Sequence, residues 1–160
     1  MARVFSILEV VNIAVDDEEA GAAFYSVLAE SASDTALRST FADLAEQEKG
    51  HKQRFEKLLR ELADGRDLEP LTGESSGYLQ ALVGSLVFTN EQAAQTAARG
   101  CPNDAAAIDL AIRFERDTLA LMQELLPLVP EKDAAVIEKL KQEERSHLVT
   151  LAEARKILAT

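Results

Sequence analysis

The sequence predicts an all-helical protein of 160 residues, organised as two helical hairpins. Hydrophobic residues make up 47% of the chain but aromatic residues only 5%, and apolar residues recur every three or four positions in four long segments. The two halves of the chain also repeat one arrangement of acidic and histidine residues. A chain of this length can bury one sizeable core, so we expect a single domain over residues 1–160.

The first hairpin is predicted to span about residues 4–63. Its first helix covers about residues 4–32 and its second covers about residues 34–63, where the apolar stripe is clearest. Between them, Ser31–Asp34 offers the small polar side chains that favour the start of a helix. Asp64–Gly65 follows the second helix as a candidate C-terminal cap.

Residues 64–102 are predicted to connect the two hairpins as a crossover. The crossover begins as a loop that contains glycine and proline, and it includes a short helix that ends at Gly100. Thr89 and Gln92 match a capping box at the start of this helix. A connection of this length can return across the bundle, which would let the second and third core helices run parallel.

The second hairpin is predicted to span about residues 103–159. Its first helix begins near Asn103 and Asp104, two residue types that favour a helix start. Its second helix covers about residues 131–158 and follows Pro130, which suits the beginning of a helix.

A short pattern occurs once in each hairpin, as Glu48-Lys49-Gly50-His51 and as Glu144-Arg145-Ser146-His147. Residues three apart are neighbours on a helix, so each pattern projects a carboxylate and an imidazole from one face. A further glutamate lies 30 positions before Glu48, and another lies 29 positions before Glu144. The six residues defined in this way are Glu18, Glu48, His51, Glu115, Glu144 and His147.

Either pattern alone is more typical of a solvated helix face, and Glu18 lies in an acidic run that could be ordinary surface. The joint pattern favours a site, because all six residues interrupt apolar stripes and the two hairpins bring the glutamates to the same depth. Moving an ion into a protein interior costs several kcal/mol, so four facing carboxylates need counter-charge. Two divalent cations would supply it, which predicts a dinuclear metal site with these six ligands.

Carboxylate oxygens and imidazole nitrogens suit iron or manganese better than a structural zinc site, which prefers four nitrogen and sulfur ligands. We therefore expect two iron or manganese ions, and zinc could occupy the same positions. Bridging carboxylates leave open coordination positions, which suit a small oxidant and favour catalysis over a purely structural metal pair. No side chain is predicted to be a catalytic group or to bind another cofactor.

Charge and composition exclude several classes of function. A net charge of −11 and a pI near 4.6 disfavour binding to nucleic acid or to an anionic membrane surface. No apolar run approaches the roughly 18 residues needed to span a bilayer. The single cysteine, Cys101, excludes a disulfide or a four-cysteine iron site within this chain. We expect a cytoplasmic protein.

Two further residues have two interpretations each. Cys101 precedes Pro102 at a predicted helix start, where a thiolate could be stabilised, but an incidental or buried cysteine is the simpler interpretation. Tyr25 lies on the same helix face as Glu18, so it is either a core aromatic residue or a neighbour of the metals. Neither residue is counted as catalytic.

With these residues in place, the chain resembles the rubrerythrin family of ferritin-like di-iron proteins. The similarity runs through residues 18–25 and 48–51 in the first hairpin, and through residues 115–117 and 144–147 in the second. The resemblance implies a ferritin-like antiparallel four-helix bundle that holds two iron ions and reduces hydrogen peroxide to water, as a defence against oxidative stress. It also implies that the glutamates of the two Glu-x-x-His patterns are among the bridging ligands.

Two departures from the family matter for function. Full-length rubrerythrins carry a further iron domain with four cysteines, so electrons for this chain would have to come from a separate donor protein. Rubrerythrins also commonly carry an extra glutamate three positions after the third-helix ligand, where this chain has Thr118.

The resemblance and the site leave three functions open. The first is a peroxidase-type oxidoreductase that acts on hydrogen peroxide, or on oxygen, with electrons from an external donor protein. The second is ferritin-like iron binding, in which the site oxidises ferrous iron for storage. The third is a metal pair that only stabilises the bundle. We favour the first and expect a homodimer.

Overall fold

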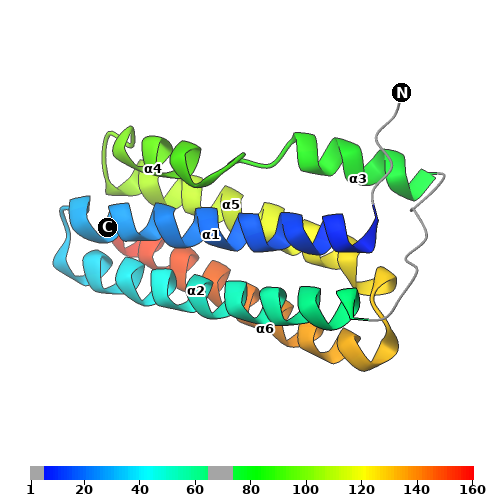
Figure 1. Cartoon of the computed structure of the whole chain (residues 1–160). Helices are drawn as coiled ribbons and strands as arrows, with labels where there is room; N and C mark the ends of the chain where they lie inside the picture. Colours follow the sequence, from blue (N-terminus) through cyan, green and yellow to red (C-terminus); the bar gives the residue numbers. More distant parts are fainter. Residues whose placement is uncertain (1–5, 65–73) are drawn as a thin grey trace.

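The computed structural model describes residues 6–64 and 74–160. Four long helices lie side by side as a bundle, as Figure 1 shows. They are α1 (Ile7–Ser31), α2 (Thr35–Ala63), α5 (Asp104–Leu125) and α6 (Glu131–Leu158). The crossover contributes two shorter helices, α3 (Glu74–Gly84) and α4 (Glu91–Arg99). The described residues include no strand, so the prediction of an all-helical protein is confirmed.

The helix directions follow from the long crossover. In Figure 1, α1 and α6 run in one direction, while α2 and α5 run in the other, so the second and third core helices are parallel as expected. Helices α1 and α2 have the most extensive contacts, α5 and α6 also pack closely, and α1 packs on α5 and α2 on α6. Within the crossover, α4 packs on α1 and α3 packs on α5. The crossover therefore lies over the outer surface of α1 and α5.

Side-chain caps explain where several helices begin. Asp34 precedes α2 and its carboxylate accepts a hydrogen bond from the Leu37 N–H, and Asn103 caps α5 in the same way. The prediction that Thr89 caps α4 is wrong. Asn90 is the cap, because its side-chain oxygen accepts from the Ala93 N–H. A single turn of 3₁₀ helix, Leu126–Leu128, separates α5 from α6 and was not predicted.

Parts of the expected boundaries lie outside the described residues, namely residues 4–5 of the first helix, Gly65 after the second, and most of the expected loop. The division into one domain over residues 1–160 stays a prediction. The termini of the long helices that the structure does describe agree with the expected ones to within a few residues. The length of each helix therefore follows from its apolar periodicity and its caps.

The core consists of two apolar clusters. We call one the aromatic cluster, because it contains Phe24, Tyr25, Phe41, Phe88 and Phe114. We call the other the aliphatic cluster, since valine, leucine and isoleucine dominate it. Its largest fully buried aliphatic side chains are Leu62, Leu79, Leu121 and Leu125.

Along each long helix, one cluster ends before the predicted ligands and the other begins after them. On α1, for example, the aliphatic cluster reaches Val15 and the aromatic cluster begins at Ala20. On α6, Leu140 belongs to the aliphatic cluster and Leu151 to the aromatic one. The six predicted ligands therefore occupy a polar layer that divides the apolar core in two.

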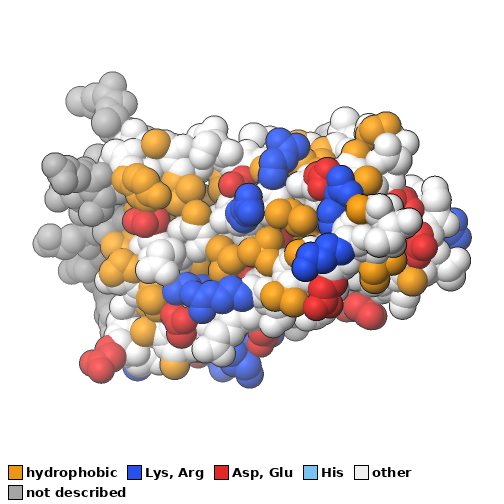
Figure 2. Space-filling view, turned by 180° about the vertical axis from the view of Figure 1, so that it is seen from behind, with side chains coloured by type: hydrophobic (Ala, Val, Ile, Leu, Met, Phe, Trp, Pro, Cys, Tyr) orange, Lys and Arg blue, Asp and Glu red, His pale blue; other side chains and the backbone are white. Residues whose placement is uncertain are grey.

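The surface mixes charges of both signs. Figure 2 shows basic, acidic and apolar side chains interspersed over one long face, with no continuous basic band of the kind that follows a nucleic acid backbone. Among the helices that the structure describes, none has a stretch sufficiently long and apolar to cross a bilayer.

Candidate metal centre

The structure brings all six predicted ligands together at the middle of the bundle. Each long helix contributes to the set, and none of the six side chains is more than 2% exposed. Helix α1 provides Glu18, α2 provides Glu48 and His51, α5 provides Glu115, and α6 provides Glu144 and His147. Residues that are far apart in the sequence therefore meet because the two hairpins place their glutamates at equal depth.

The six residues form two overlapping groups of four, and the ligand atoms within each group lie within 4.8 Å of one another. Glu18, Glu48, His51 and Glu144 form what we call the first position. Glu48, Glu115, Glu144 and His147 form the second position. Because Glu48 and Glu144 belong to both groups, they lie where carboxylates that bridge two cations would have to lie.

The two imidazole rings point the same nitrogen into the layer. His51 Nδ1 lies 2.5 Å from Glu144 Oε1 and 3.5 Å from Glu18 Oε2. His147 Nδ1 lies 2.8 Å from Glu144 Oε2 and 3.1 Å from Glu48 Oε1. The rings are nearly parallel, with an interplanar angle of 11° and centroids 5.3 Å apart. The Nδ1 lone pairs therefore converge on the same space as the carboxylate oxygens.

Nearly all the inward-facing polar atoms lack a hydrogen bond within the described part of the chain. They are both oxygens of Glu18, Glu48 and Glu144, Oε2 of Glu115, and Nδ1 of His51 and His147. Buried polar atoms in native proteins are almost always paired, because an unpaired one costs about 1–3 kcal/mol. The concentration of so many unpaired oxygen and nitrogen atoms in one place indicates a binding site for cations, which would accept their lone pairs.

The pKa values of three of the buried glutamates are shifted upward. Burial, together with the neighbouring Glu144 carboxylate, raises the pKa of Glu18 and that of Glu48 well above the usual value. Burial, followed by the charge of Glu48, does the same to the pKa of Glu115. In the absence of a cation, burial and the neighbouring charges favour the protonated form of these three carboxyl groups. Bound cations would displace those protons.

Glu144 differs from the other three glutamates. Burial raises its pKa, but close contacts with the His147 and His51 rings outweigh this effect and lower the pKa to about 2. Burial lowers the pKa of His147, whereas its contacts with Glu115, Glu144 and Glu48 raise the pKa, and the net shift is upward. The two imidazole rings therefore favour the charged form of Glu144, whereas the pKa values of the other three glutamates shift in the opposite direction.

Two divalent cations fit this donor set. Four carboxylates supply four negative charges, two cations supply four positive ones, and each position offers three carboxylates and one imidazole. Oxygen-rich ligand sets with a nitrogen donor suit iron and manganese. The assignment of the six residues as ligands stays a prediction, which the unpaired atoms support.

Two neighbours shape the second position. The Tyr25 hydroxyl donates a short hydrogen bond to Glu115 Oε1, so Tyr25 is both a core aromatic residue and a neighbour of the layer. Gly21 lies against the ring of Phe114 and near Glu48. A Cβ atom there would be 2.6 Å from Phe114 Cζ and 3.2 Å from Glu48 Oε2. Sequence reasoning missed Gly21, although glycine inside a helix, which costs about 1 kcal/mol, signals a packing constraint.

The outward-facing nitrogen of each histidine also has a partner. His51 Nε2 lies 2.9 Å from Glu143 Oε2, and His147 Nε2 lies 3.2 Å from Gln47 Oε1. Arg54 donates to both oxygens of Glu143, and this contact lowers the pKa of the Glu143 carboxyl. Sequence reasoning missed these three residues. The available signal was that Gln47 and Glu143 occupy the same place in the two repeats.

Thr118 and Asp17 form a buried pair beside the layer. The Thr118 hydroxyl lies 2.7 Å from Asp17 Oδ2 and donates to it, and burial raises the pKa of Asp17 to about 7. Thr118 occupies the position on α5 where the resemblance to rubrerythrins would place a further glutamate, and Asp17 faces it from α1. Among the described residues, the layer therefore contains four glutamates and two histidines.

Cys101 shows no sign of activation. Its thiol is half-buried, donates to the Ala97 carbonyl at 3.3 Å, and has a pKa that burial raises. A reactive cysteine requires the opposite shift, toward the thiolate. The structure therefore agrees with the simpler interpretation of this residue.

The comparisons with known proteins agree with the fold. The sequence profile of the rubrerythrin family matches residues 9–155. A protein of Thermotoga maritima, solved as a candidate ferritin-like diiron-carboxylate protein, superposes with a TM-score of 0.72 at 21% identity, over 98% of each chain. A hypothetical protein from Pyrococcus furiosus has a TM-score of 0.69 at 23% identity, over 97% of this chain and 91% of its own. No curated protein matches the chain.

Proposed function

Because the chain belongs to the rubrerythrin family, we propose that it is a di-iron oxidoreductase that reduces hydrogen peroxide to water with electrons from a separate donor protein. One observation carries the proposal. Six buried ligand-type residues from four helices converge with their lone pairs unpaired, in two groups that share two carboxylates. This arrangement suits two redox-active cations better than a single structural one.

The fold is ferritin-like, and the six residues would share the binding of the metal pair. When bound, the iron pair supplies two electrons, so that one peroxide, two electrons and two protons give two water molecules. Glu48 and Glu144 would bridge, while Glu18 with His51, and Glu115 with His147, would each complete one position. The apolar clusters above and below the layer exclude bulk water from it.

Tyr25 and the outer partners of the histidines hold the ligands in place. The Tyr25 O–H donates to Glu115, which fixes the direction of that carboxylate. Hydrogen bonds at the outer nitrogen fix the tautomer and the ring orientation of a histidine ligand. Glu143 and Gln47 supply these contacts, so both Nδ1 atoms stay directed into the layer.

Stopped-flow mixing of the di-ferrous protein with hydrogen peroxide, and separately with oxygen, tests the proposal. We expect oxidation by peroxide to be faster than oxidation by oxygen at equal concentration. A reaction with peroxide that is no faster than the reaction with oxygen would contradict the peroxidase function. Metal analysis of protein purified without added metal identifies the ions that the chain retains.

A second function, oxidation of ferrous iron for storage, is favoured by one observation. Thr118 lies where rubrerythrins commonly carry a further glutamate, and its hydroxyl is bonded to Asp17. The stopped-flow experiment supports this function if oxygen is the faster oxidant. Size-exclusion chromatography provides an independent test, because storage requires a hollow assembly and a monomer or dimer encloses no cavity.

A further inference from the structure

The two histidines have crosswise partners outside the metal centre. The residue that precedes the shared glutamate of one hairpin contacts the histidine of the other hairpin. Gln47 on α2 reaches His147 on α6, at 3.2 Å, and Glu143 on α6 reaches His51 on α2, at 2.9 Å. The two contacts therefore occupy equivalent places in the repeat, but one is made by an amide and the other by a carboxylate.

The difference lies in charge. Glu143 presents a carboxylate, and Arg54 donates to its two oxygens at 3.0 and 2.7 Å. Gln47 presents a neutral amide, and within the described part of the chain its nitrogen donates only to the Asp43 carbonyl of its own helix, at 3.4 Å. A hydrogen bond to a carboxylate increases the basicity of a histidine ligand more than a hydrogen bond to an amide does. The contact with Glu143 therefore favours a more basic His51, and the contact with Gln47 has a weaker effect of the same kind on His147.

We propose that Glu143 is a positioning residue that makes the first position, which contains Glu18 and His51, the tighter of the two metal positions. The inference rests on the proposed metal centre but not on the peroxidase reaction. Outer partners of metal ligands typically change metal affinity by about 10–100-fold. A single carboxylate outside the ligand set would therefore decide which position fills first.

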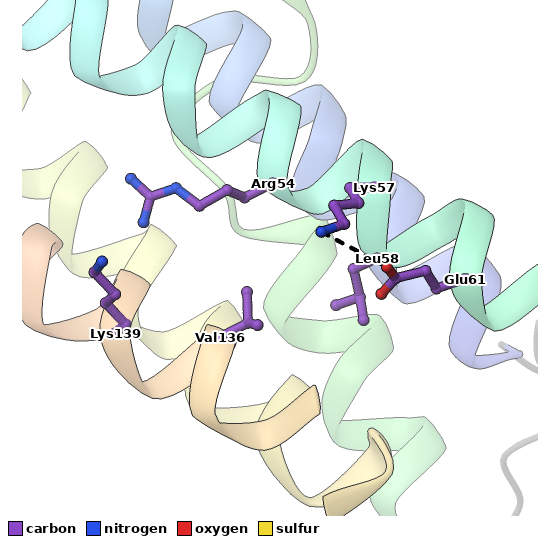
Figure 3. A pocket seen from close by; sticks show the side chains of 6 residues that line it. All are labelled: Arg54, Lys57, Leu58, Glu61, Val136 and Lys139. Atoms are coloured by element: carbon purple, nitrogen blue, oxygen red, sulfur yellow. Dashed lines mark ion pairs between the residues drawn. The ribbon is translucent and has the colours of Figure 1, made fainter. Parts of the chain in front are cut away.

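The surroundings of Glu143 make it a suitable residue to change. Its side chain is 29% exposed and that of Arg54 is 36% exposed, so neither is part of the apolar clusters. Figure 3 shows Arg54 extending from α2 into a hollow of about 310 Å³ between α2 and α6, which Lys57, Leu58 and Val136 also line. Replacing Glu143 by glutamine keeps its shape, so we expect the bundle to fold as before.

Titration of the metal-free full chain with Co²⁺, followed by calorimetry, tests the inference. We expect two ions per chain with different dissociation constants. Two backgrounds isolate the positions, since Glu115→Ala removes a ligand of the second position only and Glu18→Ala a ligand of the first only. In the Glu115→Ala background, E143Q should weaken binding 10–100-fold. In the Glu18→Ala background, E143Q should change binding by less than twofold.

The reciprocal variant Q47E is the matched control. It places a carboxylate behind His147, so it should tighten binding in the Glu18→Ala background and leave the Glu115→Ala background unchanged. Q47E also decides the question if E143Q does not fold, which the unfolding temperature of the metal-free protein reveals. Equal effects of either variant on both positions, or no effect on either, would overturn the inference. Binding of fewer than two ions by the unsubstituted chain would instead overturn the metal centre itself.

Discussion

The apolar clusters and the polar layer between them are buried to the same degree, but different interactions stabilise them. The clusters gain free energy simply by leaving water, at about 25 cal/mol per Å² of apolar surface. The layer loses hydration of four carboxyl groups and two imidazoles and leaves most of their inner atoms unpaired. The clusters therefore specify the fold, while the layer lowers its stability until positive charge compensates it.

Burial alone therefore does not indicate a stabilising contact. Phe24 and Glu18 lie on the same helix and are both fully buried. Phe24 packs against Phe88 with ring centroids 4.8 Å apart, whereas Glu18 has no hydrogen-bond partner among the described residues. A stability measurement with and without metal should separate the two contributions.

The largest expected effect is that of Phe24→Ala. Removing a fully buried phenylalanine leaves a cavity and typically costs about 3–5 kcal/mol. Because the cost comes from apolar packing, it should be the same for the metal-free and the metal-loaded protein. Urea unfolding of both forms measures it. A cost that differs between the forms by more than about 1 kcal/mol would show that the aromatic cluster and the layer are energetically coupled.

Metal binding should have the next largest effect. A ligand that binds only the folded state stabilises it by about 2.7 kcal/mol when its concentration is 100 times the dissociation constant. We expect Fe²⁺ or Mn²⁺ to raise the unfolding free energy by this amount per position, and a chelator to reverse the change. In contrast, Glu18→Gln should abolish much of the gain while leaving the metal-free protein no less stable. An unfolding free energy that does not change when metal is added would refute the interpretation of the layer as a metal centre.

The fold and the ligand set were accessible from the sequence because both depend on periodicity. Apolar residues at helical spacing define the long helices, and Glu48 with His51 on one stripe signals a polar interruption of it. The contact between Arg54 and Glu143 was not accessible, since it requires the relative rotation of α2 and α6. Thr89 was mistaken for a cap because Thr89 and Asn90 are both suitable cap residues, and only the backbone geometry distinguishes them.

Gly21→Ala should have a smaller effect that joins the two regions. The added Cβ would be 2.6 Å from Phe114 Cζ and 3.2 Å from Glu48 Oε2, so the ring and the carboxylate must move apart. Overpacking costs about 1–3 kcal/mol, and the better helix propensity of alanine returns about 1 kcal/mol. We expect a net loss of about 1 kcal/mol together with weaker metal binding. Gly50→Ala is the control, because nothing lies within 4 Å of a Cβ atom there.

Asp104→Ala should have the smallest effect. Asp104 is a polar side chain that is paired within the protein and needs no cation, unlike the glutamates of the layer. The Asp104 carboxylate accepts from the backbone N–H groups of Ser33 and Asp34, both at 3.0 Å, and so ties the start of α5 to the α1–α2 turn. Because the group is half-exposed and its bonds exchange with water, its loss should cost roughly 0.5–1 kcal/mol. The cost should be identical with and without metal. If instead it grew on metal removal, polarity itself, rather than unpaired burial, would explain the metal dependence of the layer.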